Sequence, residues 1–181
     1  MVDGKKKGGK YERDISKLLS SWWTDGEDES VFWRTSGSGA KATVNHKKKA
    51  INFNYYGDIG YRDSIGAPFI ERACIECKHY KEFYIMDILK DNKNPSEFEK
   101  FWEEVKFEAG QSNRWAILIT KKNYFPDLIM IEEDIFLFDD KFESEEKLIY
   151  DNGVVVVLDK FLDRVKPVEF IERVPIKKDD N

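Results

Sequence analysis

The residues best suited to chemistry lie in one largely apolar segment, "FIERACIECKHY" at residues 69–80. Its alternation predicts a half-buried β-strand, and side chains at positions i and i+2 of a strand point to the same face. Glu76 and Lys78 therefore share one face. Burying a charge there costs on the order of several kcal/mol unless the charge is paired or bound to a metal. The two residues are thus either a salt bridge at the strand end or part of a functional site.

An acid two residues before a lysine is a common pattern in this sequence. It occurs six times, starting at Asp3, Glu76, Asp91, Glu104, Asp139 and Glu145. Five of these triplets lie in polar helical or loop surroundings, where a solvated ion pair is the ordinary explanation. Only the triplet that starts at Glu76 lies within an apolar strand, so this one is the candidate for chemistry.

A further acid, Asp58 in "GDI", begins the preceding strand candidate, "GDIGYRD". With "SIGAP" as the turn, this strand and residues 69–80 are predicted to form a hairpin that places Asp58 opposite Glu76. Two carboxylates this close repel each other, and a divalent cation between them removes the conflict. Such a cation polarises a phosphate oxygen and acidifies a bound water, while a neighbouring lysine neutralises charge in the transition state. Asp58, Glu76 and Lys78 therefore predict metal-assisted phosphodiester hydrolysis.

The remaining metal-binding residue types restrict the choice of cation. The only histidines are His46 and His79, and the only cysteines, Cys74 and Cys77, form a single C-x-x-C. This set is too small for a structural zinc site, and cysteines three apart on a strand point to opposite faces, which argues against a disulfide. Oxygen ligands favour Mg²⁺, Mn²⁺ or Ca²⁺. Of these, we expect Mg²⁺, with Mn²⁺ as its substitute.

The charge distribution allows a nucleic-acid partner although the 181-residue chain has a net charge of −5. Residues 1–60 hold 11 Lys and Arg against 8 Asp and Glu, a net +3. Two lysine runs contribute to this excess: Lys5, Lys6 and Lys7, and Lys47, Lys48 and Lys49. Such runs are most often solvated surface, but a local basic patch on an acidic protein also binds phosphates.

Periodicity and turn signals predict an α/β fold with a mixed central sheet flanked by helices. A helix is expected over residues 10–23 and another over 96–110, where Ser96 and Glu99 make a capping box. Strands are expected in "VFWRT", "RWAILITKK" and "DLIMIEE", with a hairpin on an Asn-Gly turn in "LIYDNGVVVVLD". Residues 40–56 are expected to form a long loop or ragged hairpin, and "KFLDRV" a short helix. The domain organisation predicted is a flexible basic arm at 1–9, one domain at 10–174 and a frayed tail at 175–181.

No apolar run is long enough for a transmembrane helix, and no apolar segment follows the N-terminal lysines as in a secretory signal. We therefore expect a cytoplasmic protein that does not act at a membrane.

In order along the chain, "KKGGKYERDI", "FWRTSGSG", "GDI" and "IECK" resemble the motifs of the PD-(D/E)xK nuclease superfamily. Within it they are most similar to those of the archaeal-type Holliday-junction resolvases. The resemblance covers residues 5–80 well and extends loosely through residues 96–121. It implies a restriction-endonuclease-like fold, a divalent cation and a DNA substrate.

Carried over by motif, the resemblance implies roles for further residues. Glu12 would complete the metal site, directly or through water, as a third acid beside Asp58 and Glu76. Arg34, Ser36 and Ser38 match positions that contact phosphate. Gly37 and Gly39 would let the backbone approach DNA closely.

The sequence also departs from the resolvase pattern. "GDI" replaces "PDI", which keeps the acid and loses the rigid proline. The segment between "GSG" and "GDI" is longer than expected and carries the second lysine run. Nothing beyond about residue 122 matches the pattern.

The function predicted from these observations is a Mg²⁺-dependent DNA endonuclease, specifically a Holliday-junction resolvase acting in recombination and repair. A resolvase cuts two strands symmetrically, so a homodimer on branched DNA is expected. One alternative is a restriction or repair nuclease of the same superfamily that cuts linear, mismatched or flapped DNA. Alternatives of other classes are a non-catalytic DNA-binding module and a binding or scaffold protein with a structural Glu76–Lys78 pair.

Overall fold

The computed structural model describes residues 4–35, 56–81, 85 and 95–178. The helices in these ranges are α1 (Gly4–Trp23), α3 (Ala67–Ile70), α4 (Glu97–Gln111), α5 (Leu158–Arg164) and α6 (Pro167–Arg173). The strands are β1 (Phe32–Arg34), β2 (Ile59–Tyr61), β3 (Ala73–Tyr80), β4 (Trp115–Lys122), β5 (Leu128–Glu132), β6 (Leu148–Tyr150) and β7 (Gly153–Val157). Short 3₁₀ turns are η3 (Ser64–Gly66), η5 (Glu133–Ile135), η6 (Asp139–Lys141) and η7 (Ser144–Glu146). None of these helices is long and apolar enough to cross a membrane.

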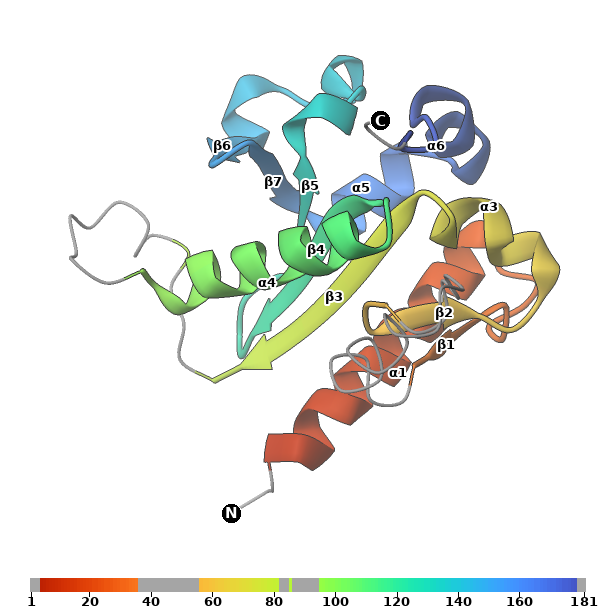
Figure 1. Ribbon diagram of the computed structural model, residues 1–181, viewed down its shortest axis with the longest axis horizontal. Coiled ribbons are helices and arrows are strands. Elements are labelled where there is room, and N and C mark those ends of the chain that lie inside the picture. The colour runs from red at the N-terminus through yellow and green to blue at the C-terminus, as the bar shows by residue number, and fades with distance from the viewer. Residues whose placement is uncertain (1–3, 36–55, 82–84, 86–94, 179–181) are drawn as a thin grey trace.

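The central element is a five-stranded mixed sheet in the order β3-β4-β5-β7-β6 (Figure 1). β3 and β4 are parallel, and the other neighbouring pairs are antiparallel. The parallel pair needs a crossover, which α4 supplies. β1 and β2 form a separate antiparallel pair beside α1. The predicted α/β class with a mixed central sheet flanked by helices is confirmed.

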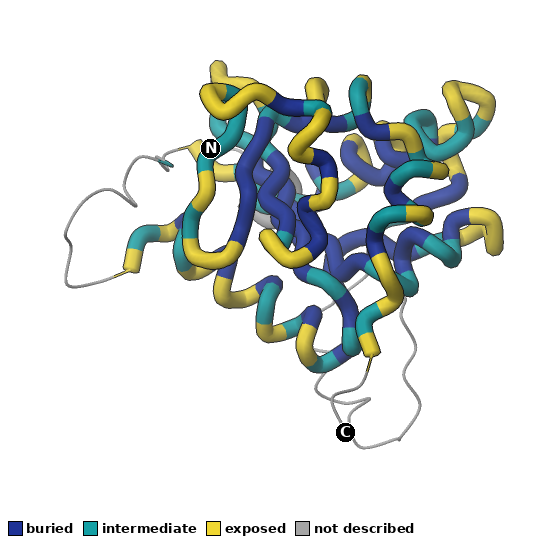
Figure 2. The backbone as a smooth tube through the Cα atoms, turned by 90° about the horizontal axis from the view of Figure 1, so that it is seen from above, coloured by how far each residue is buried: buried dark blue, intermediate teal, exposed yellow. Residues whose placement is uncertain are grey.

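Helices cover both faces of the sheet. On one face, Ala116 and Leu118 of β4 pack in a core with Trp102 of α4. On the other face, Ile117 and Ile119 pack in a second core that includes residues of α1, α5 and α6. Strands β3, β4, β5 and β7 are accordingly mostly buried, and the exposed residues gather toward the outside of the molecule (Figure 2). This two-sided burial explains the continuous apolar run in "RWAILITKK".

The predicted hairpin between "GDIGYRD" and residues 69–80 is wrong. β2 pairs with β1 instead, and β3 pairs with β4. β3 begins only at Ala73, because η3 and α3 intervene and Pro68 lies in the first turn of α3. Proline is favoured at that position and disfavoured within a sheet, so the chain turns helical before the strand starts.

The ends of the described chain also differ from the sequence prediction. α1 begins at Gly4 rather than at residue 10, so residues 4–9 continue the helix instead of forming an arm. Near the other end, the Trp115 indole donates to the Pro175 carbonyl and Asn113 donates to the Lys177 carbonyl. The chain is therefore held against the sheet as far as Lys177.

Three other elements follow the prediction with small changes. α4 starts with the predicted capping box of Ser96 and Glu99, and α5 is the predicted short helix. The β6–β7 hairpin forms, but its turn residues are Asp151 and Asn152, with φ of 46° and 57°. Gly153 begins β7, where a Cβ atom would collide with Met130.

A fully buried arginine, Arg114, ties the loop before β2 to the start of β3. Its guanidinium donates to the carbonyl oxygens of Ile70, Ala73 and Tyr56 at 3.0, 3.1 and 3.1 Å. Its Nε donates to Ser112 Oγ at 2.9 Å. Because buried backbone carbonyls need donors, this side chain fixes the two segments that flank the acidic site described below.

We expect Arg114→Met to lower the free energy of unfolding by about 3–5 kcal/mol, because several buried acceptors would lose their donor. Urea denaturation of the variant and of the exposed-site control Arg13→Met measures this effect. The control is expected to change stability by less than about 0.5 kcal/mol. A loss below about 1 kcal/mol for Arg114→Met would mean that water replaces the guanidinium.

Candidate active site

Asp58 bridges the open edge of β3, the first strand of the sheet. The Asp58 amide donates to the Ile75 carbonyl at 2.7 Å, and the Cys77 amide donates to Asp58 Oδ2 at 2.9 Å. Asp58 thus occupies the place of a paired strand residue, using its backbone for one bond and its side chain for the other. Glu76 lies between these two partners in the sequence, so Asp58 is brought beside it without the predicted hairpin.

Gly57 has the backbone conformation that this bridge needs. Its φ is +72°, and a Cβ atom there would lie 2.7 Å from the Ile75 carbonyl oxygen. Its amide donates to Glu108 Oε2 at 2.9 Å. Proline has φ near −65° and no N–H, so it fits neither requirement. The departure from "PDI" to "GDI" therefore has a physical reason in this chain.

We expect Gly57→Ala to lower the free energy of unfolding by about 2–4 kcal/mol, because it combines left-handed strain with a clash against backbone. Gly26→Ala is the matched control, since Gly26 also has positive φ, +89°, but no atom within 4 Å of its Cβ position. That control is expected to cost about 1–2 kcal/mol. If the two variants lose equal free energy of unfolding in chemical denaturation, contact with β3 does not restrict the residue at position 57.

Lys78 lies between two carboxylates. Its Nζ is 2.9 Å from Glu76 Oε1 and 2.9 Å from Glu104 Oε2 of α4. Asp58 and Glu76 are each 9% exposed. Among the described residues, Glu76 Oε2 is buried and has no hydrogen-bond partner. A buried carboxylate oxygen left in this state could accept from a water or bind a cation.

Burial and nearby negative charge raise the pKa of both Asp58 and Glu76. Burial raises the pKa of Asp58 to about 6, against the hydrogen bond from the Cys77 amide, and the charge of Glu12 adds to the rise. Burial and the charge of Asp58 hold the pKa of Glu76 well above its ordinary value. Burial lowers the pKa of Lys78, but the neighbouring Glu76 and Glu104 outweigh it and leave that pKa raised. Positive charge in addition to that of Lys78 would stabilise the ionised form of both acids, and a divalent cation provides such charge.

Glu12 of α1 lines the same cavity but does not converge with the other two acids. Its Oε2 accepts a short hydrogen bond from Arg34 Nε, and Gly9 leaves room for that guanidinium against the helix. In the described part of the chain, no three acidic, histidine or cysteine side chains are grouped closely enough to hold a metal. The role of Glu12 as a third ligand stays a prediction.

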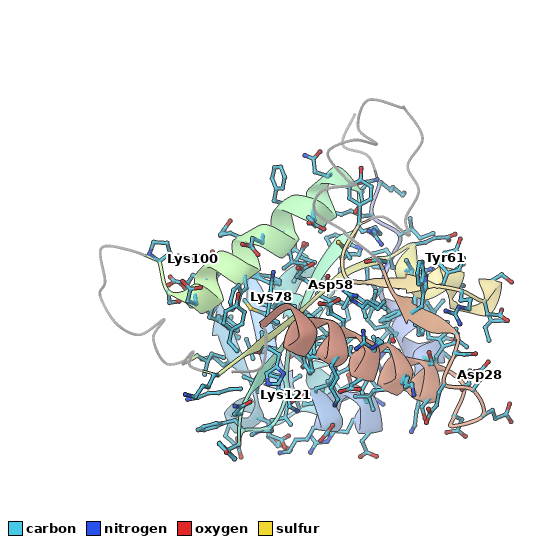
Figure 3. All side chains as sticks on the ribbon, turned by 90° about the horizontal axis from the view of Figure 1, so that it is seen from below. Asp28, Asp58, Tyr61, Lys78, Lys100 and Lys121 are labelled. Carbon is cyan, nitrogen blue, oxygen red and sulfur yellow. The ribbon has the colours of Figure 1, made fainter. Side chains whose placement is uncertain are left out.

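The cluster opens into a cavity of about 540 Å³. Its lining residues are Gly8, Glu12, Asp58, Glu76, Cys77, Lys78, His79, Tyr80 and Lys81. Asp58 and Lys78 lie near each other beside the first turns of α1 (Figure 3). Burial raises the pKa of the Cys77 thiol, so it stays neutral and is a poor ligand. His79 is hydrogen-bonded to Asn123, which leaves the carboxylate oxygens of Asp58 and Glu76 as the donors. They fit Mg²⁺ or Mn²⁺ held by two carboxylates with water and substrate phosphate.

Most of the predicted DNA-contacting residues fall outside the part of the chain that the structure describes. Arg34 pairs with Glu12. Lys5, Lys6 and Lys7 lie in α1, but their side chains fall outside the described part of the structure. Ser36, Gly37, Ser38, Gly39, Lys47, Lys48 and Lys49 lie outside the described residues, as does most of the predicted loop at 40–56. Their contribution stays a prediction.

Sequence reasoning missed two acids of α4. Glu104 contacts Lys78, and Glu108 accepts from the Gly57 amide and adds negative charge near Glu76. Both belong to the helix that crosses over from β3 to β4. Their i, i+4 spacing beside the apolar stripe of this helix was the available signal, since such residues lie on one helix face.

An edge strand that carries acid-x-lysine, with an aspartate bridging it at an α/β sheet, is the arrangement that the resemblance to the PD-(D/E)xK nucleases implies. The family described as "Phage putative PDDEXK endonuclease" matches residues 3–171, and the chain belongs to this family. No curated protein matches the sequence. Among solved structures, the chain is similar to Hjc of Archaeoglobus fulgidus, a Holliday junction resolvase, at 14% identity over 92% of this chain and 97% of that chain. The TM-score is 0.33, and at that value the likeness supports no conclusion about this chain.

Proposed function

We propose that this protein is a divalent-metal-dependent endonuclease that hydrolyses phosphodiester bonds in DNA. The observation that carries this proposal is the pair of buried carboxylates, Asp58 and Glu76, beside the Lys78 ammonium in an open cavity. A purely structural ion pair does not require a second buried acid with raised pKa, nor a carboxylate oxygen without a hydrogen-bond partner. Membership of a PDDEXK endonuclease family supports the same reaction class.

The residues of the site have different roles in the proposed reaction. Asp58 and Glu76 would hold the cation, which supplies polarisation of the phosphate oxygen and activation of water. Lys78, kept protonated by Glu76 and Glu104, neutralises negative charge that develops on the phosphate. Arg34 pairs with Glu12 of the cavity lining, and its guanidinium would contact a phosphate of the bound strand beside the cavity.

The proposed substrate is a four-way DNA junction, cut by a homodimer. This finer assignment rests on the order of four motifs, from "KKGGKYERDI" to "IECK", that resembles the resolvases. Symmetric cutting of a junction needs two active sites related by a two-fold axis, which a homodimer provides.

Cleavage of a labelled DNA panel in Mg²⁺ or Mn²⁺ tests the proposal, with the metal omitted in parallel. The panel contains a four-way junction, a flap, a mismatch, a linear duplex and a single strand. Paired symmetric nicks in the junction alone, absent from Glu76→Ala, are the expected result. Cutting of the other substrates would replace the resolvase by a restriction or repair nuclease. Absence of metal-dependent cutting of every substrate would overturn the nuclease proposal.

A further inference from the structure

The turn between β4 and β5 presents two consecutive aromatic side chains to solvent. Tyr124 is fully exposed, at 103%, and Phe125 is 58% exposed. Neither belongs to the two hydrophobic cores of the described residues. Single exposed apolar residues are ordinary on a protein surface. Two adjacent rings at the tip of a hairpin that belong to neither core form a surface available to a partner.

The backbone at this turn gives a second, independent observation. Tyr124 has φ of +68°, in the left-handed region. Glycine and asparagine are favoured there, and a bulky side chain is an outlier. The fold alone would therefore select a small residue at position 124. A strained aromatic at such a position indicates that its side chain serves a contact outside the fold.

A cationic side chain accompanies the Phe125 ring. Lys122 Nζ lies 4.3 Å from the centroid of the Phe125 ring. Lys121 precedes it and pairs with Asp127 at 2.8 Å, so one acid faces the turn as well. Aromatic rings combined with lysines are the usual means of binding single-stranded nucleic acid, since every base has a π-face and every linkage a phosphate. A protein partner with an apolar surface would not need this basic flank.

The turn lies next to the candidate active site. In the β3–β4 register, Lys78 is opposite Thr120 and Tyr80 is opposite Lys122. With a rise of about 3.3 Å per residue and about 4.8 Å between strands, the last residue of β4, Lys122, lies roughly 8 Å from the Lys78 backbone, and the turn begins roughly 11 Å from it. Both strands end at the same end of the sheet (Figure 1). Lys122 shares the sheet face of Lys78, because residues in register lie on one face, whereas Lys121 lies on the opposite face, over the Tyr11 ring. A DNA strand with its phosphate at Lys78 therefore passes the turn within a few nucleotides.

We propose that Tyr124 and Phe125 stack on an unpaired or splayed base of the DNA strand next to the scissile phosphate. This inference rests on the proposed function and assigns it a substrate class: DNA in which bases beside the cut are accessible outside the duplex stack. Branched junctions, flaps and bubbles meet this requirement, and continuous duplex does not. Loss of stacking is expected to weaken binding roughly 5- to 100-fold per base.

The test uses the double variant Tyr124→Asn/Phe125→Ser in the full chain. Ile149→Ser is the control, because Ile149 is 61% exposed on β6, at the opposite edge of the sheet. Binding is measured by fluorescence anisotropy in EDTA on a junction, a bubble and a continuous duplex, with 2-aminopurine at the branch as a reporter of stacking. The double variant is expected to lose roughly 10- to 100-fold in affinity for the junction and bubble only, together with the 2-aminopurine signal. Asn at position 124 relieves the backbone strain, so the melting temperature of the double variant is expected to equal or exceed that of the wild type.

The outcomes separate this inference from the proposed function. Unchanged affinity of the double variant, with cleavage by the wild type intact, would overturn the stacking inference alone. An equal loss on junction, bubble and duplex would also overturn it, because the turn would then contact the backbone and not a base. Failure of the wild type to bind or cut any DNA would overturn the proposed function, and the stacking inference with it. Tyr124→Phe keeps the ring and is expected to bind as the wild type does.

Discussion

Lys78→Met is expected to slow DNA cleavage roughly 10²- to 10³-fold, the usual effect of removing one group that stabilises transition-state charge. The Lys78 ammonium is held between Glu76 and Glu104, and its pKa is raised, so it stays positively charged at neutral pH. It therefore acts by its charge and not as a proton acceptor. Single-turnover cleavage of the preferred DNA substrate, measured from pH 6 to 9, checks this role. No lysine ionisation should limit the rate in that range.

Lys106→Met is the matched control for this variant. Lys106 also lies between two acids, 2.8 Å from Glu103 and 2.7 Å from Asp151, but on α4 outside the cavity. We expect its cleavage rate to stay within about 3-fold of the wild type, because surface ion pairs contribute little. If Lys78→Met cleaves as fast as this control, the Glu76–Lys78 pair is structural and the proposed chemistry is wrong.

Asp58→Asn is expected to abolish cleavage and to stabilise the metal-free protein at pH 7.5. The folded-state pKa of Asp58 is about 6, above its ordinary 3.8, so the folded protein binds this proton more tightly than the unfolded chain does. The contribution of Asp58 to the free energy of unfolding therefore falls as pH rises from about 4 to 6, and it stays lower above that window. Asparagine removes the charge and retains an oxygen that can accept from the Cys77 amide. At pH 7.5 the free energy of unfolding of the variant is expected to exceed that of the wild type by about 1–3 kcal/mol. The upper value corresponds to the full rise of the Asp58 pKa from 3.8 to about 6.

Urea denaturation in EDTA at pH 4 and pH 7.5 measures this difference, which should shrink toward zero at pH 4. Addition of Mg²⁺ or Mn²⁺ should then stabilise the wild type more than the variant, because only the wild type keeps both carboxylates. This second readout reports cation binding independently of cleavage. A variant less stable than the wild type at pH 7.5 would show that the Asp58 carboxylate is a structural group.

Local rules in the sequence determine much of the fold. The capping box at Ser96 starts α4, and the two-sided apolar pattern of β4 predicts a covered strand. The side-by-side placement of Glu76 and Lys78 follows from the two-residue period of a strand. Each of these features depends on residues close together in the chain, so composition and spacing suffice to predict them.

The remaining features of the site depend on contacts between distant segments. Asp58 reaches Glu76 by bridging the open edge of β3, and Glu104 reaches Lys78 from α4 across 26 positions of sequence. The positive φ of Gly57 is required only because Ile75 lies against it. The perturbed pKa of Asp58 arises from burial, which is a property of the assembled sheet and helices. The sequence thus determined which residues could do the chemistry, whereas their pairing and protonation follow from packing that no local pattern encodes.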